Sequence, residues 1–404
     1  MSQETMDVTS PLRASLAEKA LKIRGGEDSA FFKLLKMAEK RDGVIRLGRG
    51  EPDIPTPAHI IAAAKQALDD GRTTYTNPAG LPELRAAISE KLNHDNDLTY
   101  DPDSEIIVTA GAQESMVVTL QTLLDPGDEV LIASPYYMAY PSNILLAGGT
   151  PVLVPTTEEQ GFELRPAAIE EKISPRTKLV VLVSPNNPTA GVLTRETLEG
   201  IADVVERHDL LAISDELYEK VVYDGFEPVS FATLPRMRER TVTINGFSKA
   251  YSMTGFRVGY MAGPVDYIKA ALEPRHSLSI CASTPSQYAA LAALQGSDEF
   301  LAEMLAEYTQ RRAAMGAAFD ALGVTYSPPL GGFYYFANIR AAGLSSYDFC
   351  ERALLDHGLL FLPGSLFGDE GEGYIRIGYL APQDELEEAL DRFGTMWREL
   401  TGAA

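Results

Sequence analysis

The middle of the chain alternates short apolar runs with longer amphipathic stretches, and this alternation constrains the fold more than any other feature. The apolar runs are Glu105–Thr109, Glu129–Ala133, Pro151–Val154, Lys178–Val183, Leu210–Ile213, Thr241–Ile244 and Val258–Ala262. Helical patterns such as Gln113–Leu124 and Thr194–His208 separate several of them. Strands without polar alternation, joined by helices, are typical of a mostly parallel sheet that is covered on both faces. We therefore expect a large α/β domain over residues 58–296.

The two ends of the chain have a different pattern. Residues 11–41 are expected to be helical with a break at Gly25-Gly26, and a long helix is expected to end near Leu322. Short strands with turn signals follow within residues 328–339 and 374–380, and a last helix follows Pro382. This pattern predicts a smaller α+β domain that residues 1–57 and 297–404 form together.

Composition narrows the class of protein. The 404 residues include 35 Lys+Arg and 57 Asp+Glu, a formal net charge of −22, and so acidic a surface repels nucleic-acid phosphates. No apolar run approaches the ~20 residues of a membrane helix, and the polar first ten residues do not resemble a signal peptide. Two cysteines and five scattered histidines predict no metal site. We expect a cytoplasmic, metal-independent protein without nucleic-acid or membrane partners.

Residues with chemical potential follow the predicted strands. In open parallel sheets, ligands bind outside the carboxyl ends of the strands. The residues found there are Gly111-Ala112-Gln113 at a helix start, Tyr136-Tyr137, Asn186-Asn187, Asp215 with Tyr218, and Ser248-Lys249 with Arg257. A lysine forms a Schiff base with an aldehyde, and a carboxylate keeps a pyridine nitrogen protonated. A helix start and an arginine bind phosphate. The set predicts a site for pyridoxal 5′-phosphate.

Each of these residues also has an ordinary structural interpretation. Lys249 alone is typical of a solvated surface, Asp215 of a helix N-cap, and Asn187 before a proline of a turn. Tyr136 and Tyr137 are both candidates for packing or for stacking on a ligand ring, and Tyr137 is preferred. The occurrence of all of them at neighbouring strand ends favours the binding site.

Six segments carry a resemblance to a known family. They are NGFSKAYSMTGFRVGY (245–260), SPNNPTAG (184–191), SDELY (214–218), YTNPAGLPELR (75–85), GEPD (50–53) and GYIRIGY (373–379). With these segments in the family's order along the chain, over about residues 40–380, the chain resembles the class I/II aminotransferases, which are fold-type-I pyridoxal-phosphate enzymes of the aspartate aminotransferase kind. The resemblance implies a large domain with a mostly parallel sheet between helices, and a smaller α+β domain.

The resemblance also implies roles for individual residues. Lys249 is implied to form the Schiff base and then to move the proton between the substrate Cα and the cofactor. Asp215 is implied to pair with the pyridinium nitrogen, while Tyr218 and Asn187 bind the ring oxygen and Tyr137 stacks on the ring. The implied phosphate contacts come from Gly111, Ala112, Gln113, Ser248 and Arg257, with Tyr75 reaching across a dimer interface. The implied contacts to the substrate carboxylate come from Arg376, Gly50 and Asn187.

The substrate side chain is less constrained. Gln113 stands where some dicarboxylate-specific relatives carry a lysine, so Arg49 or a partner-subunit arginine such as Arg275 is the alternative contact for a second carboxylate. Tyr140, Phe333 and Tyr335 are candidates for aromatic walls that would tolerate apolar side chains.

The function implied by the resemblance is transfer of an α-amino group from an L-amino acid to a 2-oxo acid, with ping-pong kinetics and a homodimer with shared active sites. A C–S β-lyase of the same fold, a synthase acting on an S-adenosyl substrate, and a non-enzymatic regulatory module are the alternatives. The net charge and the short segment before the first motif disfavour the regulatory module.

Overall fold

The computed structural model describes residues 30–402. Of the helical stretch expected over residues 11–41, the part up to residue 29 lies outside the described residues, and the remainder contains helix α4 (Ala30–Ala38). None of the helices in the described part of the chain is long and apolar enough to cross a membrane.

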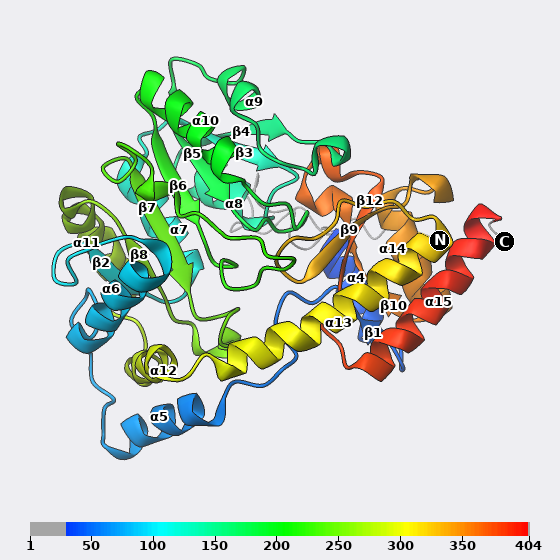
Figure 1. The fold of residues 1–404 in the computed structure, drawn as a ribbon, viewed down its shortest axis with the longest axis horizontal. Coiled ribbons are helices and arrows are strands. Elements are labelled where there is room, and N and C mark those ends of the chain that lie inside the picture. The colour runs from blue at the N-terminus through cyan, green and yellow to red at the C-terminus, as the bar shows by residue number, and fades with distance from the viewer. Residues whose placement is uncertain (1–29, 403–404) are drawn as a thin grey trace, which may run out of the picture.

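A seven-stranded sheet forms the centre of the molecule (Figure 1). Its strands are β2 (Ile106–Thr109), β3 (Glu129–Ser134), β4 (Thr150–Pro155), β5 (Thr177–Val183), β6 (Leu211–Asp215), β7 (Thr241–Gly246) and β8 (Gly259–Ala262). Their order is β2-β8-β7-β6-β5-β3-β4, and β8 runs antiparallel to both of its neighbours while the other six strands share one direction. The predicted mostly parallel sheet is confirmed, and each apolar run forms a strand.

Both faces of this sheet are buried, which explains the uninterrupted apolar runs. In β5, Leu179 and Val181 belong to the core cluster on the side of the helices α7 and α11, whereas Val180 and Leu182 belong to the cluster on the side of α9 and α10. The covering helices are α7 (Ala112–Leu123), α8 (Ala139–Leu146), α9 (Pro166–Glu170), α10 (Arg195–Arg207) and α11 (Val265–Ser279). Successive strand residues point to opposite faces, so an apolar residue is needed at every position.

Three further helices lie beside the β2 end of the sheet. They are α5 (Ala58–Asp69), α6 (Pro82–Asn96) and α12 (Thr284–Gln295). α12 packs on α5 and on α6, and a core cluster with Ile60, Leu84 and Ala289 joins them to β2 and β8. Figure 1 shows α5 and α12 together at the end of the molecule away from α15.

The second group of elements contains two small sheets and three helices. β1 (Ile45–Arg46) pairs with β10 (Leu359–Leu360), and β12 (Tyr374–Gly378) lies between β11 (Leu362–Pro363) and β9 (Tyr334–Asn338). The helices are α13 (Glu299–Leu322), α14 (Ser346–His357) and α15 (Gln383–Thr401). The end of α13 at Leu322 and the start of α15 after Pro382 agree with the predictions.

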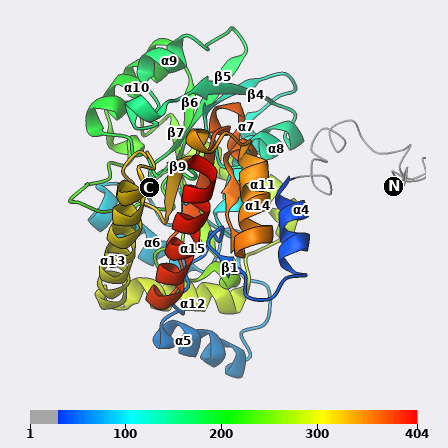
Figure 2. The same ribbon diagram turned by 90° about the vertical axis from the view of Figure 1, so that its right-hand side faces the viewer.

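The beginning of the described chain packs with its end. Leu34 of α4 and Ile45 of β1 belong to one core cluster with Phe319, Phe349 and Phe393 from α13, α14 and α15. Figure 2 shows α4 beside α14, with α15 next to them. The proposed domain limits at residues 57/58 and 296/297 stay a prediction.

Candidate active site

A cavity of about 760 Å³ lies at the carboxyl edge of the central sheet, between this edge and the small sheets. Residues that line it include Gly50, Ala112, Gln113, Tyr137, Asn187, Asp215, Tyr218, Ser248, Lys249, Arg257 and Arg376. The topology explains why they meet. β2, β3, β5, β6 and β7 end at this edge, and β8, which runs the other way, begins there, so Arg257 just before β8 lies at the same edge.

Lys249 follows β7 and points into the cavity. Its Nζ donates a hydrogen bond to the carbonyl oxygen of Gly50 and lies 5.7 Å from the centre of the Tyr218 ring. Burial lowers the pKa of the Lys249 ammonium, and the cations of Arg376 and Arg257 act in the same direction. A lowered pKa increases the fraction of neutral amine, which is the form that acts as a nucleophile or a base.

Asp215 ends β6 and lines the cavity. One carboxylate oxygen accepts a hydrogen bond from the Tyr140 hydroxyl at 2.7 Å, and the other accepts one from the Leu217 backbone N–H at 3.3 Å. Burial raises the pKa of the Asp215 carboxyl. Nearby positive charge therefore does not offset the burial of the Asp215 carboxylate, and a cationic group in the cavity would stabilise it.

The loop between β2 and α7 forms a cradle for an anion. Gly111 has a φ of +84°, and a Cβ there would lie 2.7 Å from Arg257 Nη2, so glycine allows the guanidinium to approach the loop. A Cβ on Gly259 would lie 2.8 Å from the Ala112 nitrogen, so this contact also requires glycine. The free N–H groups at the start of α7 and the Arg257 guanidinium are together suited to a phosphate. Gly111 does not itself line the cavity, and its contribution is the close approach of Arg257 to the loop.

Glu114 and Arg275 lie next to each other and hold the loop between β2 and α7 in place. The Ala110 N–H donates to Glu114 at 2.5 Å, and Glu114 lies 3.9 Å from Arg275 Nε. Arg275 is fully buried and donates to the Val108 carbonyl at 3.1 Å. The expectation that Arg275 reaches the substrate of a partner subunit is therefore wrong, because its guanidinium is enclosed within its own chain.

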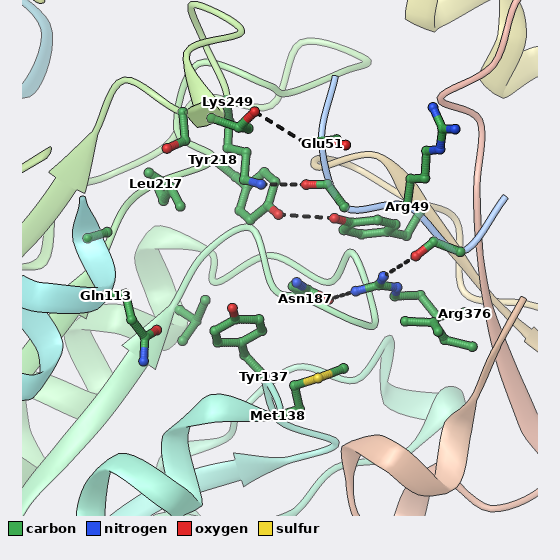
Figure 3. A pocket seen from close by; sticks show the side chains of 18 of the residues that line it. Arg49, Glu51, Gln113, Tyr137, Met138, Asn187, Leu217, Tyr218, Lys249 and Arg376 are labelled. Atoms are coloured by element: carbon green, nitrogen blue, oxygen red, sulfur yellow. Dashed lines mark hydrogen bonds between the residues drawn. The ribbon is translucent and has the colours of Figure 1, made fainter. Parts of the chain in front are cut away.

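Arg376 projects from β12 and is held in one orientation. Its Nη1 donates to Asn187 Oδ1 at 2.8 Å, and its Nη2 donates to the Gly48 carbonyl at 2.9 Å (Figure 3). Its guanidinium carbon lies 4.2 Å from the centre of the Tyr334 ring and 5.2 Å from that of Phe367. Its Nε is buried without a hydrogen-bond partner. A buried, desolvated cation in a cavity wall is suited to bind a carboxylate.

The aromatic candidates differ in whether they line the cavity. Tyr137 lines the cavity, with its ring edge-on to Tyr140 at a centroid distance of 5.4 Å, whereas Tyr136 is not among the lining residues. Burial raises the pKa of Tyr137. Tyr75 is 76% exposed and does not line the cavity, so a single chain does not bring it to the site.

The Gln113 side chain donates to Asn143 at 3.0 Å beside the cavity.

The expected aromatic walls are partly wrong. Tyr140 lines the cavity as expected, but Phe333 and Tyr335 do not, and Tyr334 does. Side chains alternate along β9, so the residue between the two candidates is the one that faces the cavity, while the Tyr335 hydroxyl donates to the Arg312 carbonyl at 2.8 Å. The run 333–336 is aromatic at every position, so the sequence carries no alternation that selects Tyr334. Other lining residues that were not anticipated include Leu35, Arg46, Met138, Leu360 and Leu362.

The turn after β6, which carries Asp215 and Tyr218, rests on a buried carboxylate. Glu216 accepts hydrogen bonds from Ser214 at 2.8 Å and from Ser230 at 2.6 Å. Burial, and then the negative charge of Glu219, raise the pKa of Glu216 to about 7.

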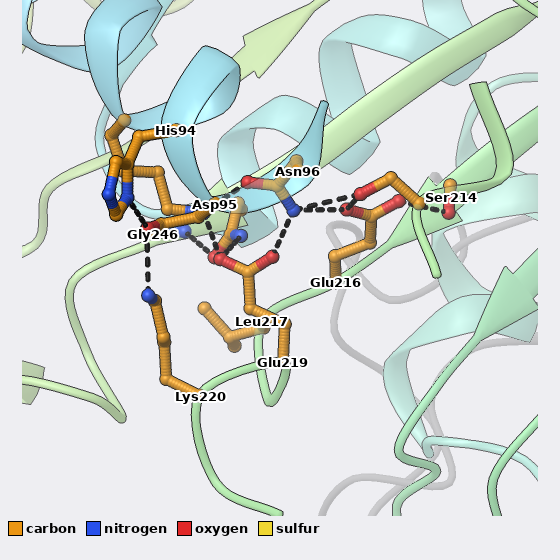
Figure 4. A network of polar contacts seen from close by, with 12 residues as sticks. His94, Asp95, Asn96, Ser214, Glu216, Leu217, Glu219, Lys220 and Gly246 are labelled. Atoms are coloured by element: carbon orange, nitrogen blue, oxygen red, sulfur yellow. Dashed lines mark hydrogen bonds and ion pairs between the residues drawn. The ribbon is translucent and has the colours of Figure 1, made fainter. Parts of the chain in front are cut away.

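Glu219 extends this network to neighbouring elements (Figure 4). It accepts hydrogen bonds from Asn245 of β7 at 2.8 Å and from Lys91 and Asn96 of α6. Asn96 also donates to Ser230 at 2.8 Å. The polar network thus ties the turn that bears Asp215 to β7, which bears Lys249 at its end.

Comparisons with known proteins identify the family of the chain. The profile of the family described as "Aminotransferase class I and II" matches residues 42–393. The chain is 42% identical to an aromatic-amino-acid aminotransferase 2 of Thermococcus litoralis and 43% identical to an aspartate aminotransferase of Pyrococcus abyssi, in each case over 92% of this chain and 96% of the relative.

A solved structure supports the same assignment. The aromatic aminotransferase of Pyrococcus horikoshii superimposes with a TM-score of 0.87 at 42% identity, over 91% of this chain and 99% of the other. The family profile and the relatives match almost the whole chain, so the chain belongs to the class I and II aminotransferases and is an aminotransferase.

Proposed function

We propose that this aminotransferase moves the α-amino group of an L-amino acid to a 2-oxo acid with pyridoxal 5′-phosphate as cofactor, in two half-reactions with ping-pong kinetics. The observation that carries the proposal is the placement of Lys249, Asp215 and Arg376 around one cavity, with the anion cradle of Ala112 and Arg257 at its end. An amine, a carboxylate, an anion site and a carboxylate-binding cation are the groups that this reaction needs.

The residues present fit this cofactor. The cradle at the start of α7 suits its phosphate, and Ser248 lines the same part of the cavity. Asp215 suits a protonated ring nitrogen, because a cation there would offset the burial that raises the pKa of the carboxyl. The Tyr218 hydroxyl and Asn187 suit the ring oxygen, and Tyr137 suits a ring face.

When bound, the cofactor supplies an aldehyde that condenses with amines and a protonated pyridine ring that withdraws electrons from the reacting carbon. The chain supplies the proton transfers and the orientation. The Lys249 amine, with its lowered pKa, serves as the nucleophile that holds the cofactor and then as the base and acid at the substrate Cα. Arg376 binds the α-carboxylate, with Gly50 and Asn187 beside it, and so directs the Cα proton toward Lys249.

The remainder of the cavity wall is of mixed character. Leu35, Met138, Leu360 and Leu362 offer apolar contacts, and Arg46 and Arg49 offer positive charge. We therefore propose aromatic amino acids and aspartate as the first donors to compare, in keeping with the names of the two relatives.

We further propose a cytoplasmic homodimer in which Tyr75 of one subunit reaches the phosphate site of the other. Its support is the exposure of Tyr75 on the single chain together with the family resemblance of the segment around it.

A single-turnover screen tests the proposed function. The protein is loaded with pyridoxal phosphate and mixed with one L-amino acid at a time, without a 2-oxo acid. We expect the visible band to disappear with one equivalent of 2-oxo acid and one of pyridoxamine phosphate per subunit. Persistence of the band while pyruvate and ammonia accumulate from cysteine-type substrates would instead show the C–S lyase. A protein that takes up no pyridoxal phosphate would overturn the proposal.

A further inference from the structure

We propose that Tyr334 is a positioning residue of this aminotransferase: its ring fixes Arg376, and its hydroxyl orients that of Tyr218. The inference rests on the proposed function, because it assumes that Arg376 binds the substrate carboxylate and that Tyr218 binds the ring oxygen of the cofactor. Tyr334 begins β9, on the small three-stranded sheet, and is fully buried although it lines the cavity.

The ring of Tyr334 forms one side of a slot for the Arg376 guanidinium. The guanidinium carbon lies 4.2 Å from the centre of this ring, and the Phe367 ring is 5.2 Å away. Asn187 and Gly48 accept hydrogen bonds from Nη1 and Nη2. The guanidinium is thus restrained at its edges by two oxygens and by aromatic rings, and a desolvated cation gains most from such a ring.

The hydroxyl of Tyr334 lies where three parts of the site meet. It is 3.2 Å from the Tyr218 hydroxyl, and a Cβ added to Gly50 would lie 3.0 Å from it. The Gly50 carbonyl in turn accepts the hydrogen bond from Lys249. Glycine at position 50 therefore leaves room for the hydroxyl to stay within reach of Tyr218.

The direction of the hydrogen bond between the two tyrosines determines what Tyr218 can do. A phenol has one proton to donate, so when Tyr334 donates to Tyr218, the proton of Tyr218 is free to point into the cavity. A hydrogen bond received also strengthens the one donated. Tyr334 thereby makes Tyr218 a better donor to the ring oxygen of the cofactor, while its ring independently maintains Arg376.

Two variants separate these two effects. Tyr334→Leu removes ring and hydroxyl, and we expect KM to rise by about 10–30-fold, by a similar factor for aromatic and for acidic donors, because the carboxylate clamp is shared. Tyr334→Phe keeps the ring, and we expect nearly unchanged KM values. It removes the hydroxyl, so the pH at which the visible band of the loaded, substrate-free protein changes should move upward by about half a unit. The negative ring oxygen then has a weaker donor.

Tyr335→Phe is the matched control. Tyr335 is the next residue of the same strand, does not line the cavity, and its hydroxyl bonds to the Arg312 carbonyl in the core. This variant should lose some thermal stability with no change in KM or in the spectral midpoint.

The results distinguish the inference from the function on which it rests. A wild-type protein that takes up no pyridoxal phosphate would overturn the proposed function. A wild type that loads and transaminates, with Tyr334→Phe showing the spectral midpoint of the control, would overturn the role of the hydroxyl. A folded Tyr334→Leu variant with wild-type KM values would overturn the role of the ring. If Tyr334→Leu does not fold, Tyr334→Met tests the ring with an unbranched side chain.

Discussion

The Tyr140 hydroxyl donates a hydrogen bond of 2.7 Å to a carboxylate oxygen of Asp215. Tyr140 comes from α8 and Asp215 from the end of β6, so two elements 75 residues apart in the sequence meet at the wall of the cavity. Burial raises the pKa of Tyr140 well above its usual value, so the phenol remains a neutral donor. Burial alone would favour a protonated Asp215, and this hydrogen bond opposes that effect.

Replacing Tyr140 by phenylalanine tests this relationship. A hydrogen bond to a charged group contributes about 1.5–3 kcal/mol, so its loss should further raise the pKa of Asp215 and weaken the binding of pyridoxal phosphate by about 10–100-fold. Equilibrium dialysis of the cofactor measures the change. Tyr136→Phe is the control, since Tyr136 does not line the cavity, and it should bind the cofactor as the wild type does. Equal affinities in the two variants would show that the bond does not support the cofactor site.

Lys249→Ala should abolish turnover while the protein stays folded. The variant loses both the nucleophile and the group that moves the Cα proton, and general acid–base catalysis alone contributes about 10²–10⁴-fold. Transaminase activity and circular dichroism are the measurements, with the exposed Lys65→Ala on α5 as the control. Near-normal activity of Lys249→Ala would refute the proposed mechanism.

The fold was predictable because an uninterrupted apolar run indicates a strand that is buried on both faces of its sheet. In β5, alternate residues enter different core clusters, and only a sheet covered on both sides requires an apolar residue at each position. The reversed direction of β8 was not predictable from its apolar run, because direction depends on the path of the connecting loop. That reversal brings Arg257 to the same edge as Lys249.

The site was predictable where chemistry and position in the strand coincide. Asp215 and Lys249 stand at strand ends, so the topology places them together. Tyr334 was missed and Arg275 was misjudged, for different reasons. The face of a short strand decides whether residue 334 or its neighbours point inward, and the burial of Arg275 depends on Glu114 and on carbonyl groups that are distant in the sequence.

Glu216→Gln should change how stability depends on pH. The pKa of Glu216 is about 7 in the folded chain, above the ordinary 4.5, so the folded state holds a proton that the unfolded state releases between these two pH values. The carboxyl therefore lowers stability as pH rises from about 4.5 to about 7, and glutamine removes that loss. We expect the melting temperature of Glu216→Gln, relative to wild type, to rise by a few degrees from pH 5 to pH 8.

The difference between the two melting curves is the measurement, because titrating groups that do not interact with Glu216 cancel in it. Glu227→Gln, at an exposed position, is the control. A constant difference for Glu216→Gln would mean that Glu216 is ionised in the folded protein throughout.

Substitutions of Arg49 and of Arg376 should differ in the range of substrates whose KM they raise. Arg376 is buried and held by Asn187, so Arg376→Lys loses the planar two-nitrogen contact and should raise KM by about 10²-fold for every substrate. Arg49 is exposed at the cavity wall, so Arg49→Gln should raise KM for aspartate and for 2-oxo dicarboxylates while KM for phenylalanine stays unchanged. Steady-state kinetics with both donors measures this. A uniform rise in Arg49→Gln would show that Arg49 acts on the shared part of the substrate.

Mixing two impaired variants should restore activity if Tyr75 completes the site of a partner subunit. In a symmetric dimer of Tyr75→Ala with Lys249→Ala, one site contains both substitutions, and the other contains an intact Lys249 and an intact partner Tyr75. Random exchange of subunits makes half of the dimers hybrid, so roughly a quarter of all sites should be wild-type. Activity at limiting pyridoxal phosphate is followed after mild dissociation and reassociation, with each variant treated alone as the control. Sedimentation checks the dimer, and a mixture no more active than the mean of its components would show that Tyr75 acts only within its own chain.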